Sequence, residues 1–305
     1  MEPLVRVDAR TVLSVPGNRR YAINDAGVVQ LATEGLSPEA IVQQAHYDRI
    51  AAAYVANLGY PHTQEYMAYL DRALAEAVGG ASLGTAAELC CGHGEALNLL
   101  GTHIERYIGV DVSEKMLVAA AGMHSHAASL FVQGDATNLP LADACLDTVV
   151  MLGGIHHVPD RTQLFCEIAR VLKPGGRLIY REPVSDFVLW RALRAIVYRV
   201  SPILDNTTER PLIYSETVPV LAKAGLRSEV YSTHGFLGFC LFMNSDVLFF
   251  NRLFRFVPGI RGITRASAHL DRMLLSLPLL RSAGLQVIGI AVKEAPRPPH
   301  GLAAL

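Results

Sequence analysis

Three acidic side chains stand at the ends of apolar runs in the middle of the chain: Glu88, Asp111 and Asp135. After Glu88 the sequence continues Cys-Cys-Gly-His-Gly over residues 90–94. A Gly-x-Gly turn between a strand and a helix lets the backbone come close to a ligand. An acid at the end of the next strand suits the two hydroxyls of a ribose, and one after the third can accept a hydrogen bond from an adenine amino group. The spacing therefore predicts a site for an adenine nucleoside.

A dinucleotide such as NAD is the first alternative ligand to consider for this turn. Its fingerprint requires a third glycine, and Leu97 holds that position if Gly92 and Gly94 are the first two. The carboxylate of Glu88 would also repel a diphosphate. Both observations argue against an NAD enzyme.

Two adjacent histidines, His156 and His157, follow the apolar run at 147–152. Histidine titrates near neutral pH, so either ring could remove a proton from a phenol or an activated carbon. The apolar neighbours Ile155 and Val158 favour His156 as the base, and a purely structural turn stays open as the alternative. Arg181, at the end of the run 177–181, could pair with an acidic substrate, but a bridge to Glu182 is favoured.

Short apolar runs alternate with helical patterns between residues 84 and 183. Strands are predicted at 86–90, 107–111, 129–133, 147–152 and 177–181, with two more at 227–231 and 286–293. Such alternation is typical of crossover units, in which helices cover both faces of a parallel sheet. The fold class predicted is therefore α/β.

The motifs, in this order, resemble those of class I S-adenosylmethionine-dependent methyltransferases, closest to the broad small-molecule group that includes the quinone-biosynthesis C-methyltransferases. The resemblance covers about residues 46–233 and rests on the segments 91–94, 109–117, 134–140, 156–158 and 171–176. It implies a Rossmann-like, seven-stranded, mostly parallel sheet with an N-terminal helical cover and a C-terminal lid insertion. Cys90 departs from the pattern, because the family usually has glycine there.

The resemblance also implies roles for individual residues. The implied ligands of S-adenosylmethionine are Glu88, Cys90, Gly92, His93, Gly94, Asp111, Val112, Met116, Asp135, Ala136, Leu152 and Gly153. Tyr47 and Tyr54, on a leading helix that would close over the site, are expected to contact the substrate together with Arg181. No metal is expected, because Cys90, Cys91 and His93 lie within the cofactor turn and no second ligand pair follows.

The chain divides into four predicted zones: a small leading segment 1–45, a methyltransferase core 46–233, an apolar helical lid 234–283, and a last strand with its tail at 284–305. Residues 21–42 are similar to part of the PqqD-like domains that bind leader peptides, although a structural cover is the favoured interpretation. The lid mixes phenylalanines with arginines. It could line a pocket, form a homodimer contact or touch a membrane, and the last is less favoured.

Composition limits the class of protein. Hydrophobic residues make up 51% and charged residues 18% of the 305 residues, and the net charge is −1. This excludes extensive disorder and argues against a dedicated nucleic-acid binder. The odd count of 5 cysteines, with no recognisable signal peptide, predicts a cytoplasmic protein with reduced thiols.

The function predicted is methyl transfer from S-adenosylmethionine to a small lipophilic or aromatic specialised metabolite, with O-methylation favoured over C-methylation. Two alternatives stay open. The acceptor could be a ribosomally made modified peptide, or the protein could bind S-adenosylmethionine without transferring methyl.

Overall fold

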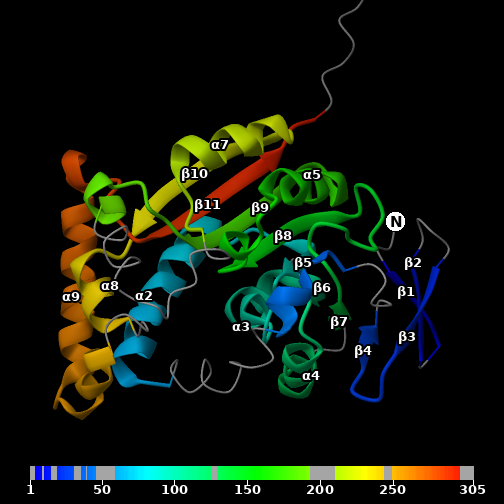
Figure 1. Cartoon of the computed structure of the whole chain (residues 1–305), viewed down its shortest axis with the longest axis horizontal. Coiled ribbons are helices and arrows are strands. Elements are labelled where there is room, and N and C mark those ends of the chain that lie inside the picture. Colours follow the sequence, from blue (N-terminus) through cyan, green and yellow to red (C-terminus); the bar gives the residue numbers. More distant parts are fainter. Residues whose placement is uncertain are drawn as a thin grey trace, which may run out of the picture.

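One mixed sheet forms the centre of the molecule (Figure 1). The computed structural model describes residues 4–8, 10–14, 19–30, 36–38, 40–45, 59–124, 129–192, 210–243 and 249–295. Within these residues the sheet has 11 strands in the order β1-β2-β3-β4-β7-β6-β5-β8-β9-β11-β10. The strands are β1 Leu4–Asp8, β2 Thr11–Ser14, β3 Arg19–Ile23, β4 Val28–Gln30, β5 Gly84–Leu89, β6 Ile104–Asp111, β7 Ser129–Gln133, β8 Leu146–Leu152, β9 Leu172–Pro183, β10 Leu226–His234 and β11 Gln286–Lys293.

Parallel pairing joins β4, β7, β6, β5, β8 and β9, and β11 runs antiparallel to both β9 and β10. The central strands are apolar along nearly their whole length, as in the Val149-Val150-Met151 stretch of β8, because both faces of the sheet are covered. All seven strands predicted from the sequence are present, and the α/β class is confirmed.

Helices cover the two faces of the sheet. Figure 1 shows α5 and α7 on one side and α2, α3 and α4 on the other. The helical elements are α2 Pro61–Val78, α3 Glu95–Leu100, η2 Gly101–His103, α4 Glu114–Met123, η3 Ile155–His157, α5 Arg161–Val171, α7 Tyr214–Lys223, α8 Leu237–Phe242, η4 Phe249–Phe256, α9 Ile260–Leu275 and η5 Pro278–Leu280.

Several helix starts follow from local chemistry. The side chain of Ser113 accepts a hydrogen bond from the amide of Met116 at the start of α4, and Asp160 caps α5 in the same way. Pro61 is the first residue of α2, where its fixed φ and missing N–H are tolerated. These caps fix where α4 and α5 begin, directly after the loops that follow β6 and β8.

The sheet is longer than the seven strands predicted. Residues 4–30 add an antiparallel meander whose last strand, β4, pairs with the edge strand β7. The sequence of the leading segment also predicts short strands at 4–7 and 11–15 and a turn over Asn18 to Arg20. The strands are present as β1 and β2, but the turn is wrong for Arg19 and Arg20, which lie in β3. This strand is largely exposed and carries two arginines, so it lacks the alternation that reveals a half-buried strand.

A separate cluster of apolar side chains lies beyond the sheet, where α8 and α9 pack against α2. Its polar centre is Asp271, which is 1% exposed. The carboxylate accepts hydrogen bonds from the hydroxyl of Tyr66 and from the amides of Phe236, Gly238 and Phe239. Asp271 therefore ties α9 to α2 and to the start of α8.

The same region contains a histidine that should weaken the fold in acid. Burial, followed by repulsion from Arg272, lowers the pKa of His234 to about 4. The folded chain keeps this ring neutral, whereas the unfolded chain protonates it below about pH 6.5. The contribution of the neutral His234 ring to the unfolding free energy is therefore fully present above pH 6.5. It is lost as the pH falls toward 4, by up to about 3 kcal/mol.

His234→Phe should remove this dependence. The measurement is the unfolding free energy from urea denaturation at pH 7.5 and pH 4.5, for both proteins. Contributions of other titrating groups, such as Glu88, cancel in the comparison. An identical pH dependence in the variant and the parent would refute the assignment to His234.

Candidate functional site

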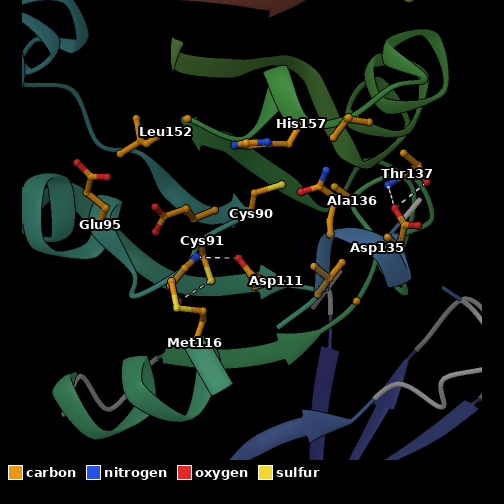
Figure 2. Close-up of a pocket in the computed structure, with 18 of the residues that line it drawn as sticks. Cys90, Cys91, Glu95, Asp111, Met116, Asp135, Ala136, Thr137, Leu152 and His157 are labelled. Atoms are coloured by element: carbon orange, nitrogen blue, oxygen red, sulfur yellow. Dashed lines mark hydrogen bonds between the residues drawn. The ribbon is translucent and has the colours of Figure 1, made fainter. Parts of the chain in front are cut away.

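A cavity of about 630 Å³ lies at the carboxyl ends of β5, β6, β7 and β8. Figure 2 shows Asp111 and Met116 on one side of it, with Leu152 and His157 on the other. Of the predicted ligands of the cofactor, only Gly94 does not line it. Those that do are Glu88, Cys90, Gly92, His93, Asp111, Val112, Met116, Asp135, Ala136, Leu152 and Gly153.

Glu88 lies at the base of the cavity and is 2% exposed. Its carboxylate accepts hydrogen bonds from the hydroxyl of Tyr107 and from the amide of Ala96, 2.9 Å away. Burial raises the pKa of Glu88 to about 8, although both hydrogen bonds act in the opposite direction. A cation placed beside this carboxyl would favour its ionised form.

Asp111 connects the end of β6 to the glycine turn after β5. One carboxylate oxygen accepts from the amide of Gly92 at 2.8 Å, and the other accepts from the amide of Ser113 at 2.9 Å. Burial raises the pKa of Asp111 above its ordinary value, and these two hydrogen bonds oppose the rise. The aspartate therefore shapes the turn as well as facing the cavity.

Asp135 closes another side of the cavity. Its carboxylate accepts from the amide and the hydroxyl of Thr137, at 2.8 and 2.7 Å, and from the amide of Ser37 at 3.1 Å. Burial would raise the pKa of Asp135, but the hydrogen bonds from Ser37 and Thr137 outweigh it and lower the pKa. Through Ser37 the N-terminal segment becomes part of the cavity wall.

Cys90 has a φ of 54°, in the left-handed region that favours glycine. Burial raises the pKa of its thiol well above the ordinary value, so the group is a neutral thiol. Its side chain has room because the facing residue is a glycine: a Cβ built on Gly154 would lie 2.6 Å from the Cβ of Cys90. The cysteine at this position therefore depends on Gly154.

Gly154→Ala should lower the unfolding free energy by about 1–3 kcal/mol, because the new methyl group overlaps Cys90. Adding Cys90→Gly should recover most of the loss, since it removes the overlapping side chain and the unfavourable φ. Urea denaturation of the single and double variants measures this. Gly80→Ala is the matched control, because nothing lies within 4 Å of its new Cβ. A double variant as unstable as Gly154→Ala would refute the overlap.

The two histidines have different surroundings. Glu182, which is 0% exposed, accepts hydrogen bonds from the amides of Gly154 and Ile155 and from Nδ1 of His156, each at 2.8 Å. The ring of His156 packs on that of His157, with centroids 3.8 Å apart. His157 lines the cavity, whereas His156 does not. The structure thus places His157, and not the favoured His156, where a substrate could reach it.

Arg181 is 5% exposed and does not line the cavity. The expected bridge to Glu182 is absent. Its guanidinium instead pairs with Asp71 of α2 at 2.6 Å and with Glu95 of α3. Since Asp71 and Glu95 both line the cavity, the ion pairs of Arg181 connect α2 and α3 at the cavity wall, although Arg181 itself does not line it.

Some wall residues were not predicted. Met67 and Asp71 come from α2, Glu95 from α3, and Ala40 and Gln43 from the helical residues 40–45. Glu95 directly follows the glycine turn, so its position was the signal available in the sequence. Tyr47 and Tyr54 lie outside the described residues.

The cavity wall is strongly acidic. Its carboxylates belong to Asp71, Glu88, Glu95, Asp111, Asp135 and Asp160, and no lysine or arginine lines it among the described residues. The same residues contain no group of three or more His, Cys, Asp or Glu side chains arranged to hold a metal ion. The carboxylates present can accept hydrogen bonds from hydroxyl groups and amines and can face cations.

Comparison with known proteins finds a family that this part of the chain resembles. Residues 87–180 match a family model described as a methyltransferase domain. Residues 87–180 of this chain are therefore similar to a methyltransferase domain. The domain confirms the resemblance predicted from the motifs, which is carried by the glycine turn and by the acids that follow the neighbouring strands.

The methyltransferase domain has curated relatives with lipid or small-molecule names. The chain is 33% identical over 109 residues to phthiotriol/phenolphthiotriol dimycocerosates methyltransferase 1 of Mycobacterium ulcerans, covering 34% of this chain and 40% of that protein. It is 36% identical over 108 residues to 27-O-demethylrifamycin SV methyltransferase of Amycolatopsis mediterranei, covering 33% and 38%. The matches thus span about two fifths of those relatives.

Solved structures share the fold over a longer stretch. The crystal structure of the cyclase SpnF has a TM-score of 0.59 and 18% identity, covering 86% of this chain and 98% of that one. At this identity the likeness shows the fold alone. Within the described part of the chain, no helix combines the length and apolar character needed to cross a bilayer.

Proposed function

We propose that this methyltransferase domain transfers the methyl group of S-adenosylmethionine to a hydroxyl group of a small lipophilic specialised metabolite. The observation that carries the proposal is the acidic cavity at the carboxyl ends of β5, β6 and β7, most of whose lining residues lie within the stretch that matches the methyltransferase model. The relative named for rifamycin is a 27-O-methyltransferase, which favours oxygen over carbon as the acceptor atom.

The residues present fit the cofactor. The carboxylate of Asp111 can accept hydrogen bonds from ribose hydroxyls, and Asp135 with Ala136 would hold the adenine. Glu88 and Gly92 would hold the methionine end, with Leu152 and Gly153 on the sulfonium side. A wall of carboxylates also favours a ligand that carries sulfonium and ammonium charges. When bound, the cofactor supplies an already activated methyl group.

The chain would contribute positioning and proton removal. His157 would accept the proton of the acceptor hydroxyl, since its ring lines the cavity. Glu182 holds His156, and His156 packs on His157, so this pair sets the direction of the His157 ring. Met67 and Asp71 of α2 line the cavity, and positioning of the two reactants supplies much of the rate in such a displacement.

The first test is calorimetric titration of the purified protein with S-adenosylmethionine and S-adenosylhomocysteine. Micromolar binding of both supports the cofactor assignment. A panel of lipophilic alcohols, phenols and modified peptides is then incubated with 13C-methyl-labelled cofactor, and the carbon chemical shift of the product distinguishes O-methyl from C-methyl groups. Absence of binding by a folded protein would overturn the proposal. Binding without any methylated product would favour a non-transferring cofactor protein.

A further inference from the structure

The surface formed by residues 253–281 combines exposed apolar side chains with exposed arginines. We call it the α9 surface. Its apolar members are Leu253, Phe256, Ile263, Leu270, Met273, Leu277 and Leu279. Its arginines are Arg255, Arg261, Arg265, Arg272 and Arg281. Figure 1 shows α9 as the outermost helix at one end of the molecule, opposite the β1–β4 meander.

The apolar side chains do not serve the packing of α9 on the protein. The helix already buries a separate face, which includes Ile260, Ala268 and Leu275 and packs on α2 and α8. Leu279 is 89% exposed and Phe256 is 68% exposed. These two residues extend the surface beyond both ends of α9, into η5 and η4. A run of large exposed apolar side chains within one segment indicates a contact that the described residues do not themselves provide.

The α9 surface carries a net positive charge, although α2 brings two carboxylates to it: Glu65 pairs with Arg261 and Arg265, and Glu76 lies 3.9 Å from Arg272. Asp271 is the only acidic residue between 253 and 281, and it is buried among backbone amides. Arg265 is held at the surface by Glu65, at 2.8 Å, and Arg255 lies over the ring of Tyr60 at 5.2 Å. On α9 itself, Arg261, Arg265 and Arg272 form a flank on the α2 side, and helical spacing places this flank about half a turn away from Ile263 and Leu270. A partner that suits this surface has an apolar layer to contact the apolar side chains and an adjacent anionic layer to contact the arginines.

We propose that the α9 surface docks the protein on anionic phospholipid bilayers. The apolar side chains would enter the boundary of the acyl chains, and the arginines would lie at the level of the phosphates. A second copy of the chain fits less well, because a symmetric contact would set arginines against arginines. The proposal is independent of methyl transfer, since neither the cavity nor the cofactor takes part.

Co-sedimentation with vesicles tests the proposal. The full chain is mixed with vesicles of phosphatidylcholine alone and of phosphatidylcholine with about 30% phosphatidylglycerol. We expect binding to the anionic vesicles only, and weaker binding as NaCl is raised. Leu279→Asp should weaken that binding about tenfold or more, since it removes an inserted apolar side chain and adds a repelled charge.

Met123→Asp in α4 is the matched control, because Met123 is an exposed apolar residue away from the α9 surface. It should bind vesicles like the parent, and unchanged circular dichroism shows that both variants fold. Absence of binding to anionic vesicles, or equal loss in both variants, would overturn the proposal. So would a dimer, seen by analytical ultracentrifugation, that Leu279→Asp dissociates, because the surface would then belong to a second copy.

Discussion

His157→Ala is expected to lower kcat by about 10²-fold or more while the Kd for S-adenosylmethionine stays within about twofold. The proposed role of His157 is to accept a proton from the acceptor, and its ring lines the cavity on the side opposite Asp111 (Figure 2). Removing it leaves the acidic cofactor residues in place. Single-turnover rates with the methyl acceptor, together with calorimetric titration of the cofactor, measure the two effects separately.

His156→Gln and Glu182→Gln serve as comparisons for that variant. Neither side chain lines the cavity, so both should act through the orientation of His157 and reduce kcat less than His157→Ala does. They should leave the shape of the pH–rate profile unchanged, whereas His157→Ala should remove the limb that reports the base. Near-normal turnover of His157→Ala would make the histidine a structural member of the turn.

Asp111→Ala is expected to weaken binding of S-adenosylmethionine and S-adenosylhomocysteine by about 10- to 100-fold, which corresponds to roughly 1–3 kcal/mol. The carboxylate would lose its contacts with the ribose hydroxyls. The substitution would also remove the hydrogen bond that the amide of Gly92 donates to this carboxylate at 2.8 Å, and so loosen the glycine turn. Calorimetric titration of parent and variant measures the change.

Asp111→Asn separates these two contributions. The amide oxygen can still accept from Gly92, although the NH2 group then replaces the oxygen that accepts from Ser113. The tie to the glycine turn should be kept while the charge is lost, and the affinity should fall between those of the parent and Asp111→Ala. Unchanged affinity in Asp111→Ala would contradict the ribose assignment. A large loss of unfolding free energy in Asp111→Ala but not in Asp111→Asn would show that the tie to Gly92 is mainly structural.

The local spacing of residues was enough to predict that the acids after successive strands lie close together. The carboxyl ends of neighbouring parallel strands meet at one edge of a sheet, so acids that follow successive apolar runs converge without knowledge of any long-range contact. Glu88, Asp111 and Asp135 accordingly line one cavity. The strands β7 and β11 were predicted to the residue because both are continuous apolar-rich runs flanked by polar residues or turns.

The sequence by itself thus determined the α/β class, the glycine turn and the acids around it, since these depend on the order and period of residues near one another. Only the tertiary structure decided which histidine meets the cavity, because Glu182 turns His156 away through a contact 26 residues distant. It likewise gave Arg181 its partners Asp71 and Glu95, and it joined β4 to β7. Pairings of this kind depend on which elements pack together, and no local pattern contains that information.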